Sequence, residues 1–120
     1  MSIRDALKDI VEHVEGALAA MIMAYDGLPI DEFTVLQSEF DLQSLSVEYA
    51  VVLKEIKRAA ELVKAGDMVE VAIATSQTRV AFRVLNEDLF AVLIMTSDGN
   101  FGKGRYLLRL KAYDLLRELA

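Results

Sequence analysis

The stretch Ala17–Tyr25, ALAAMIMAY, decides the fold, because it is apolar at both its odd and its even positions. Alternate side chains of a strand point to opposite faces of a sheet, so a strand of this kind has to be covered on both sides. The stretch Leu89–Thr96, LFAVLIMT, has the same pattern. The sequence therefore predicts two strands in the interior of a sheet that carries helices on both faces.

Three further strands are predicted around this pair, at Ile30–Leu36, Met68–Ser76 and Thr78–Leu85. Pro29 restricts the first of them to an edge of the sheet. The connections after residue 76 are too short for anything but antiparallel hairpins. The strand Met68–Ser76 contains neither Pro nor Lys to protect an open edge, so we expect this edge to meet another chain.

Helical spacing predicts one amphipathic helix in roughly the first fifteen residues, a second at about Gln43–Ala65 and a third that ends the chain. Ser2 and Asp5 have the form of a capping box, and Gly66 is placed as the C-cap of the second helix. The face of the second helix that should cover the sheet is assigned to Leu45, Tyr49, Val52, Leu53, Ile56, Ala60 and Val63.

The second helix has apolar residues left over on its other side. Val47, Ala50 and Val51 fall there, beside Lys54 and Arg58, where a monomer would normally show polar residues. Single exposed apolar residues are also common on ordinary surfaces. The strip is therefore either a partner contact or an unremarkable exposed face.

Together these elements predict one domain over residues 1–120, with the order α-β-β-α-β-β-β-α. The fold class is an α/β sandwich of the α+β kind, a five-stranded antiparallel sheet with helices on both faces. The net charge is −6, and all of it falls in residues 1–60, which argues against nucleic acid or a membrane as a partner. The chain has no Cys and no apolar segment long enough to span a membrane, so we expect a cytoplasmic protein.

The glycine-rich segment Ser97–Tyr106, SDGNFGKGRY, raises the question of phosphate binding. Its glycine spacing fits neither a Walker A loop nor a dinucleotide fingerprint, and Lys103 is not followed by Ser or Thr. We interpret the glycines as conformational, allowing a left-handed backbone or a close approach. With a single His and no Cys, the sequence shows no catalytic constellation, so we expect neither an enzyme nor a cofactor.

Two segments, GALAAMIMAYDGLPI (Gly16–Ile30) and GNFGKGRYLLRLKAYDLLREL (Gly99–Leu119), together with the order of elements, resemble the roadblock family of dynein light chains and its prokaryotic, MglB-like members. The resemblance implies a homodimer, or a heterodimer with another roadblock chain, in which the third strands and the central helices meet. It also implies a small Ras-like GTPase as partner, stimulated in some members through the GTPase's own catalytic residues.

The resemblance assigns roles to the two surfaces that the residue pattern left unexplained. It implies that the dimer forms at Val69, Val71, Ile73 and Thr75. It implies that the partner binds at Val47, Ala50, Val51, Lys54 and Arg58. Two hypotheses remain open: a regulatory module that dimerises and binds a GTPase, or a structural dimerisation subunit of a motor or scaffold without GTPase contact.

Overall fold

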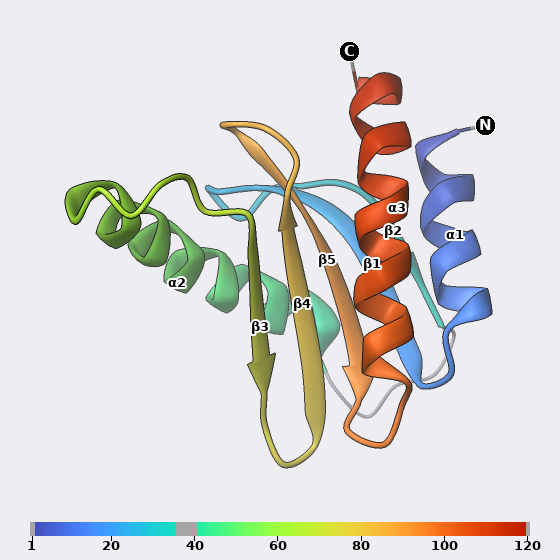
Figure 1. The fold of residues 1–120 in the computed structure, drawn as a ribbon. Helices are drawn as coiled ribbons and strands as arrows, with labels where there is room; N and C mark the ends of the chain where they lie inside the picture. The colour runs from blue at the N-terminus through green and yellow to red at the C-terminus, as the bar shows by residue number, and fades with distance from the viewer. Residues whose placement is uncertain (1, 36–40, 120) are drawn as a thin grey trace.

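The centre of the sheet is formed by the two strands that are apolar on both faces. The computed structural model describes residues 2–35 and 41–119. In it, β1 (Ala17–Ala24) pairs antiparallel with β5 (Leu89–Thr96), with Ala19 opposite Ile94 and Met21 opposite Val92. Figure 1 shows this pair in the middle of the sheet. The prediction from the two apolar stretches is confirmed.

The remaining strands extend the sheet on both sides of this pair. They are β2 (Pro29–Thr34), β3 (Glu70–Ala74) and β4 (Thr78–Val84), and the order across the sheet is β2-β1-β5-β4-β3. All neighbours are antiparallel, and β2 and β3 form the two edges. Pro29 is the first residue of the edge strand β2, as its missing N–H requires. The predicted end of this strand at Leu36 lies outside the described residues.

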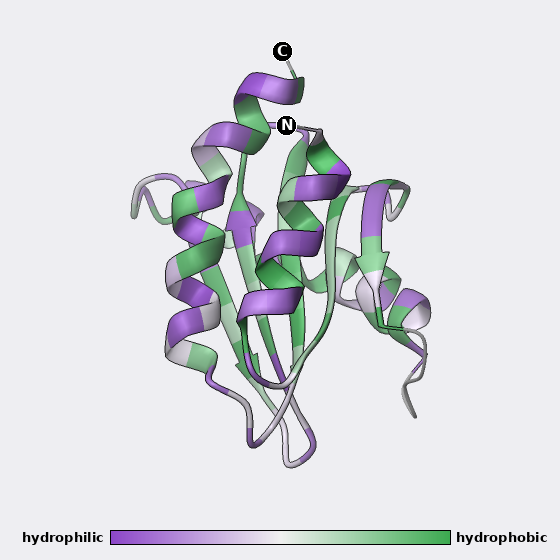
Figure 2. Ribbon diagram, turned by 90° about the vertical axis from the view of Figure 1, so that its right-hand side faces the viewer, coloured by the Kyte–Doolittle hydropathy of each residue, from purple (hydrophilic) through white to green (hydrophobic). Residues whose placement is uncertain are grey.

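Three helices cover the two faces. The helices α1 (Ile3–His13) and α3 (Phe101–Leu119) pack on one face, against Ala20, Ile22, Leu93 and Met95. The helix α2 (Leu42–Leu62) packs on the other face, against Met21, Met23, Val92 and Ile94. Figure 2 shows the matching colours: α1 and α3 alternate between hydrophilic and hydrophobic residues, whereas the central strands are hydrophobic for most of their length. No helix in the described ranges is long and apolar enough to cross a membrane.

The first helix begins as the sequence predicts. The Ser2 hydroxyl accepts the Asp5 N–H at 3.0 Å, and the Asp5 carboxylate accepts the Ser2 N–H at 3.4 Å, which completes the capping box. Further along α1, Asp9 accepts from Lys111 of α3 at 2.8 Å. This hydrogen bond to the Lys111 ammonium lowers the pKa of Asp9. The contact links the two helices on this face of the sheet.

The glycine-rich segment turns the chain from β5 into α3, and close packing explains two of its three glycines. A Cβ on Gly99 would lie 2.5 Å from the Glu15 carbonyl oxygen, and one on Gly104 would lie 2.7 Å from Leu93 Cδ2. Neither glycine has a positive φ, so close approach is the reason for both. The Asn100 side chain accepts the Lys103 N–H at 3.1 Å and thereby caps the N-terminus of α3.

The second helix ends earlier than predicted. Its C-cap is Val63 rather than Gly66, and Lys64 takes the left-handed conformation, with φ of 55°. The Ala65 N–H donates to the Ala60 carbonyl at 3.0 Å and the Lys64 N–H to the Glu61 carbonyl at 3.1 Å, which is the Schellman arrangement. Placing Gly66 as the cap was wrong. The left-handed position that follows the last helical residues, where glycine is usually found, is occupied by Lys64.

We therefore expect Lys64→Gly to raise the free energy of unfolding by about 1 kcal/mol, because glycine adopts this backbone conformation without a Cβ clash. Urea denaturation followed by circular dichroism measures the change. The matched control is Gly66→Ala, where φ is 95° and the same measurement should show a loss of stability. A Lys64→Gly protein that is less stable than wild type would contradict this explanation of the helix end.

Candidate interaction surface

The helix α2 presents a narrow stripe to the sheet. Asp41 caps its start by accepting the Ser44 N–H at 3.1 Å and the Ser44 hydroxyl at 2.7 Å, and these hydrogen bonds lower the pKa of Asp41. The buried positions on the stripe are Leu42, Ser46, Ala50 and Leu53. The Ser46 hydroxyl donates to the Leu42 carbonyl at 2.9 Å, so this buried polar group is satisfied within the helix.

The stripe differs from the one that the sequence predicts. Ala50 is only 1% exposed, so its assignment to the outer side of α2 was wrong. Val52, Ile56 and Val63 were assigned to the covered face, but all three are exposed. The apolar pattern is misleading because Ser46 is polar and yet faces the sheet, while apolar residues continue along α2 beyond the point where the sheet ends.

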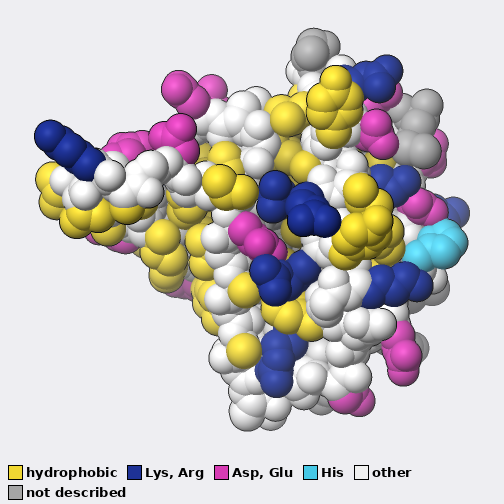
Figure 3. Space-filling view, in the orientation of Figure 1, with side chains coloured by type: hydrophobic (Ala, Val, Ile, Leu, Met, Phe, Trp, Pro, Cys, Tyr) yellow, Lys and Arg dark blue, Asp and Glu magenta, His cyan; other side chains and the backbone are white. Residues whose placement is uncertain are grey.

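Figure 1 shows that the second half of α2 runs past β3, the edge of the sheet. We call residues 52–63 the α2 arm. Figure 3 shows it as a projection from the body of the molecule, with hydrophobic side chains along its border. The exposed large apolar side chains of the arm are Val52, Ile56, Leu62 and Val63, the last two 71% exposed. A row of exposed apolar side chains of this kind is a candidate contact surface.

The strand β3 is open beside the arm. Hydrogen bonds from the Val84 N–H to the Val69 carbonyl and from the Thr75 N–H to the Thr78 carbonyl fix the two ends of its ladder with β4. Alternation in an antiparallel ladder then directs the backbone N–H and C=O groups of Glu70, Ala72 and Ala74 toward the open edge. On this side, β3 pairs with no strand of the described ranges.

The residues predicted for the dimer contact all lie on or beside this edge. Val71 and Ile73 are half-buried on the face that α2 covers. Val69 is 54% exposed just before the strand, and Thr75 is exposed just after it. The side chains of Val71 and Ile73 therefore contribute to the core that lies under α2, while the free hydrogen-bonding groups belong to the residues between them.

Four of the five residues predicted for partner binding lie on one exposed side of α2: Val47, Val51, Lys54 and Arg58, which we call the outer strip. Val51 is 61% exposed. Spacings of three and four residues place these side chains next to one another along the helix. Arg58 Nε lies 3.2 Å from Glu55 Oε2 in an exposed ion pair, which adds little stability. Ala50 is the one member that the structure removes from the strip.

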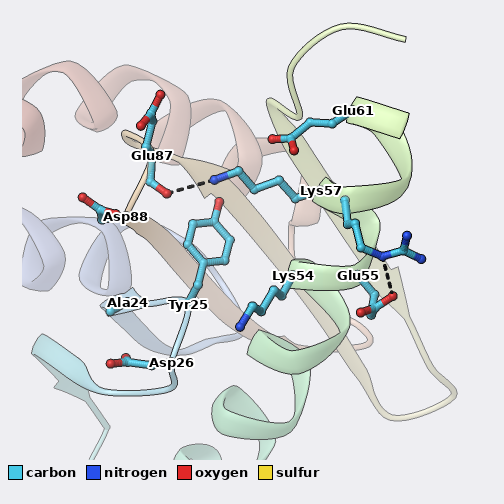
Figure 4. Close-up of a pocket in the computed structure, with 10 residues that line it drawn as sticks. Ala24, Tyr25, Asp26, Lys54, Glu55, Lys57, Glu61, Glu87 and Asp88 are labelled. Carbon is cyan, nitrogen blue, oxygen red and sulfur yellow. Dashed lines mark hydrogen bonds and ion pairs between the residues drawn. The ribbon is translucent and has the colours of Figure 1, made fainter. Parts of the chain in front are cut away.

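A groove of about 590 Å³ borders the outer strip, between α2 and the turns that follow β1 and β4. Figure 4 shows Lys57 crossing it: the ammonium donates to the Glu87 carbonyl at 2.9 Å and lies 4.6 Å from the centre of the Tyr25 ring. The Tyr25 hydroxyl is buried without a hydrogen-bond partner among the described residues, and burial raises its pKa. Asp26, Asp88 and Lys54 also line the groove, so its charges are mixed.

The described residues hold no cluster of three or more His, Cys, Asp or Glu side chains that could bind a metal ion. The surfaces that stand out are an open strand edge, an exposed helix arm and an apolar strip with flanking cations. A five-stranded antiparallel sheet with one helix on one face and two on the other is also the fold of a Roadblock/LC7 domain.

The chain belongs to the roadblock family. It is similar to the crystal structure of MglC from Myxococcus xanthus, with 42% sequence identity and a TM-score of 0.73 over 98% of this chain and 99% of that one. No family model matches the sequence. A search of curated proteins also finds no match.

More distant structures share the fold. A Roadblock/LC7 domain from Streptomyces avermitilis is 11% identical, with a TM-score of 0.83 over 99% of this chain and 98% of that one. MglB from Myxococcus xanthus is 16% identical, with a TM-score of 0.79 over 98% of this chain and 93% of that one. The predicted family and fold class are therefore confirmed, and the identity is higher to MglC than to MglB.

The two neighbouring positions Ala50 and Val51 test the orientation of α2. We expect Ala50→Arg to lower the free energy of unfolding by about 3 kcal/mol or more, because the new charge has no room and no partner against the sheet. Val51→Arg should change it by no more than about 0.5 kcal/mol, because its side chain points to solvent. Urea denaturation at one protein concentration gives both values. Equal losses for the two variants would contradict this orientation.

Proposed function

We propose that this chain is a non-catalytic regulatory module that forms a dimer and binds a small Ras-like GTPase. The observation that carries the proposal is the outer strip, Val47 and Val51 flanked by Lys54 and Arg58, which is exposed on a helix that buries Leu42, Ser46, Ala50 and Leu53 against the sheet. Family membership supports the proposal, since the identity to MglC extends over nearly the whole chain.

The proposed dimer joins two chains at β3 and the α2 arm. Pairing of two β3 edges satisfies the backbone groups of Glu70, Ala72 and Ala74, and the same approach brings the apolar arm of each chain toward the other. A roadblock chain of another sequence with the same open edge could take the place of the second copy. Both features are exposed in the single chain and adjoin one another, so one contact covers both.

A proline at the open edge tests the dimer. We expect Ala72→Pro to weaken dimerisation at least tenfold, about 1.4 kcal/mol, because it removes an outward N–H and leaves the ladder with β4 intact. Analytical ultracentrifugation measures the dissociation constant. Ile73→Pro is the matched control: its N–H faces β4, so this variant should lose monomer stability instead.

Wild-type protein that stays monomeric at high micromolar concentration would overturn the proposed dimer. A heterodimer is distinguished by repeating the measurement with a second roadblock chain from the same genome. The Ala72→Pro variant should associate at least about tenfold more weakly with either partner.

The proposed GTPase contact uses the outer strip. Small apolar side chains permit a close approach and exclude water, while the flanking cations orient an acidic partner surface and speed the encounter. The family resemblance implies that stimulation works through the GTPase's own catalytic residues, so we expect any acceleration of GTP hydrolysis to come from tighter binding to one conformation of the GTPase. The mechanism is therefore a shift between states of the partner.

We expect Val51→Arg to weaken binding of a Ras-like GTPase at least tenfold, about 1.4 kcal/mol, because it places a hydrated charge at the centre of the contact. Isothermal titration with a GTPase encoded near this chain, loaded with a GTP analogue or with GDP, measures the affinity. The control is Glu12→Arg on α1, which changes the net charge by more but lies on the opposite face.

Unchanged affinity in a folded Val51→Arg dimer would move the contact away from the outer strip. The second candidate function, a structural dimerisation subunit of a motor or scaffold, is favoured by the open β3 edge alone. Wild-type dimer that binds the GTPase in neither nucleotide state would support that alternative.

A further inference from the structure

A cluster of arginines lies on the face of the sheet opposite to α2. Strand alternation places Arg79 and Arg83 of β4 on the same side as α3, which contributes Arg105 and Arg109. The acidic residue that β3 contributes to this cluster is Glu70, which lies directly across from Arg83. Figure 3 shows Lys and Arg side chains gathered around an acidic one on this face, with hydrophobic side chains beside them. The charge of the cluster is opposite to that of the whole chain, which is −6.

Among the described residues, Glu70 forms an ion pair with one arginine, Arg105. Arg105 binds it with two bonds, Nε to Oε1 at 2.7 Å and Nη2 to Oε2 at 3.0 Å. These bonds lower the pKa of Glu70, and the charges of Arg83 and Arg109 lower it further. Neither Arg83 nor Arg109 forms an ion pair with another residue of the described ranges. The guanidinium groups of Arg83 and Arg109 thus lie near the Arg105–Glu70 ion pair, and neither has a carboxylate partner among the described residues.

These residues surround a hollow of about 220 Å³. It is lined by Glu70, Arg83, Gly102, Arg105, Tyr106 and Arg109. A carboxylate side chain fits a space of this size, and arginine offers a carboxylate two parallel donors in one plane. Gly102 leaves the wall open on the side of α3, because a Cβ there would meet nothing closer than 3.9 Å.

An aromatic stripe begins at the same hollow. Tyr106, Leu110 and Tyr113 follow one another along α3 at spacings of four and three residues, and each is about half exposed or more. Arg109 lies 5.6 Å from the Tyr106 ring centre and Arg117 lies 6.0 Å from the Tyr113 ring centre. Tyrosine and arginine are the residues most enriched where a few side chains carry the affinity of a protein contact.

We propose that the hollow and the aromatic stripe bind an acidic segment of a partner protein. An Asp or Glu side chain of the segment enters between Arg83 and Arg109, and an adjacent apolar side chain lies on Tyr106 and Leu110. This site lies across the sheet from the outer strip, so it serves a contact additional to the proposed GTPase contact and does not depend on it.

The balance of charge selects a short acidic segment over a larger polyanion. Charges are screened within about 8 Å at physiological salt. A short segment that contacts only the arginines is therefore attracted mainly by the positive charge of the cluster and is little repelled by the acidic remainder of the chain. A nucleic acid duplex or an anionic bilayer presents charge over a much longer distance and would also face the acidic remainder of the chain. An apolar stripe next to the cations also favours a polypeptide, which carries both kinds of side chain.

The test measures fluorescence anisotropy of a labelled synthetic peptide that contains alternating Glu and Leu residues, at physiological salt. We expect wild-type protein to bind it, and the double variant Arg83→Gln/Arg109→Gln to bind it at least about tenfold more weakly. The matched control is Arg4→Gln/Lys8→Gln, which makes the same change in net charge on exposed α1 and should change the affinity less than about twofold. A peptide with Gln in place of Glu should not bind.

Three results would overturn the proposal: no binding of the peptide by wild type, equal losses in both double variants, or equal binding of the Gln peptide. Vesicles containing phosphatidylserine are the comparison ligand, and binding to them in the absence of peptide binding would assign the arginines to a membrane instead. If the double variant is not folded, amide chemical shifts of wild-type protein titrated with the peptide must change around residues 79–83 and 102–110. Val51→Arg protein should bind the peptide like wild type, which separates this site from the GTPase contact.

Discussion

Burial of both faces of β1 and β5 is the constraint on which the rest of the structure depends. A strand pair without a polar face has to lie in the middle of a sheet between two layers of helix. The helices α1 and α3 supply one layer and α2 the other, and the strands with polar positions or a proline move to the edges. The remaining surfaces, the open side of β3 and the outward sides of α2 and α3, follow from what this packing leaves uncovered.

The fold could be predicted almost completely from the sequence, because two-sided apolar strands, short connections and a capping box each have a direct physical meaning. The side of α2 that faces the sheet could not be predicted correctly from the sequence. A helix of 21 residues is about 31 Å long, while five strands span about 19 Å, so a helix that crosses the strands has to overhang. Periodicity counts Ile56 and Val63 as core residues wherever they lie along that length, although both are exposed.

Periodicity along a helix is also a limited guide to the outer strip and to the arginine cluster. Spacing along α2 correctly brought Val47, Val51, Lys54 and Arg58 together, but Ala50 was placed among them because a small apolar residue fits either side of a helix. The arginine cluster depends on how far α3 lies from β4, which no local pattern encodes. The molecule thus has chemically different faces, small apolar side chains with lysine and arginine over α2, and tyrosines with arginines over α3. The sheet keeps these two faces apart, because α2 and α3 lie on opposite sides of it.

The pairing of β1 with β5 also determines the order of events during synthesis. Ala19 of β1 lies opposite Ile94 of β5, so β1 cannot form its central pairing until most of the chain has been synthesised. Until then it can pair only with β2, and an apolar face remains open to any other strand nearby. Long sequence separation between paired strands slows folding through the entropy of closing the loop. A nascent chain of this module therefore keeps an apolar strand face uncovered until β5 is made, and we expect truncated chains that lack β5 to aggregate more readily than the full chain.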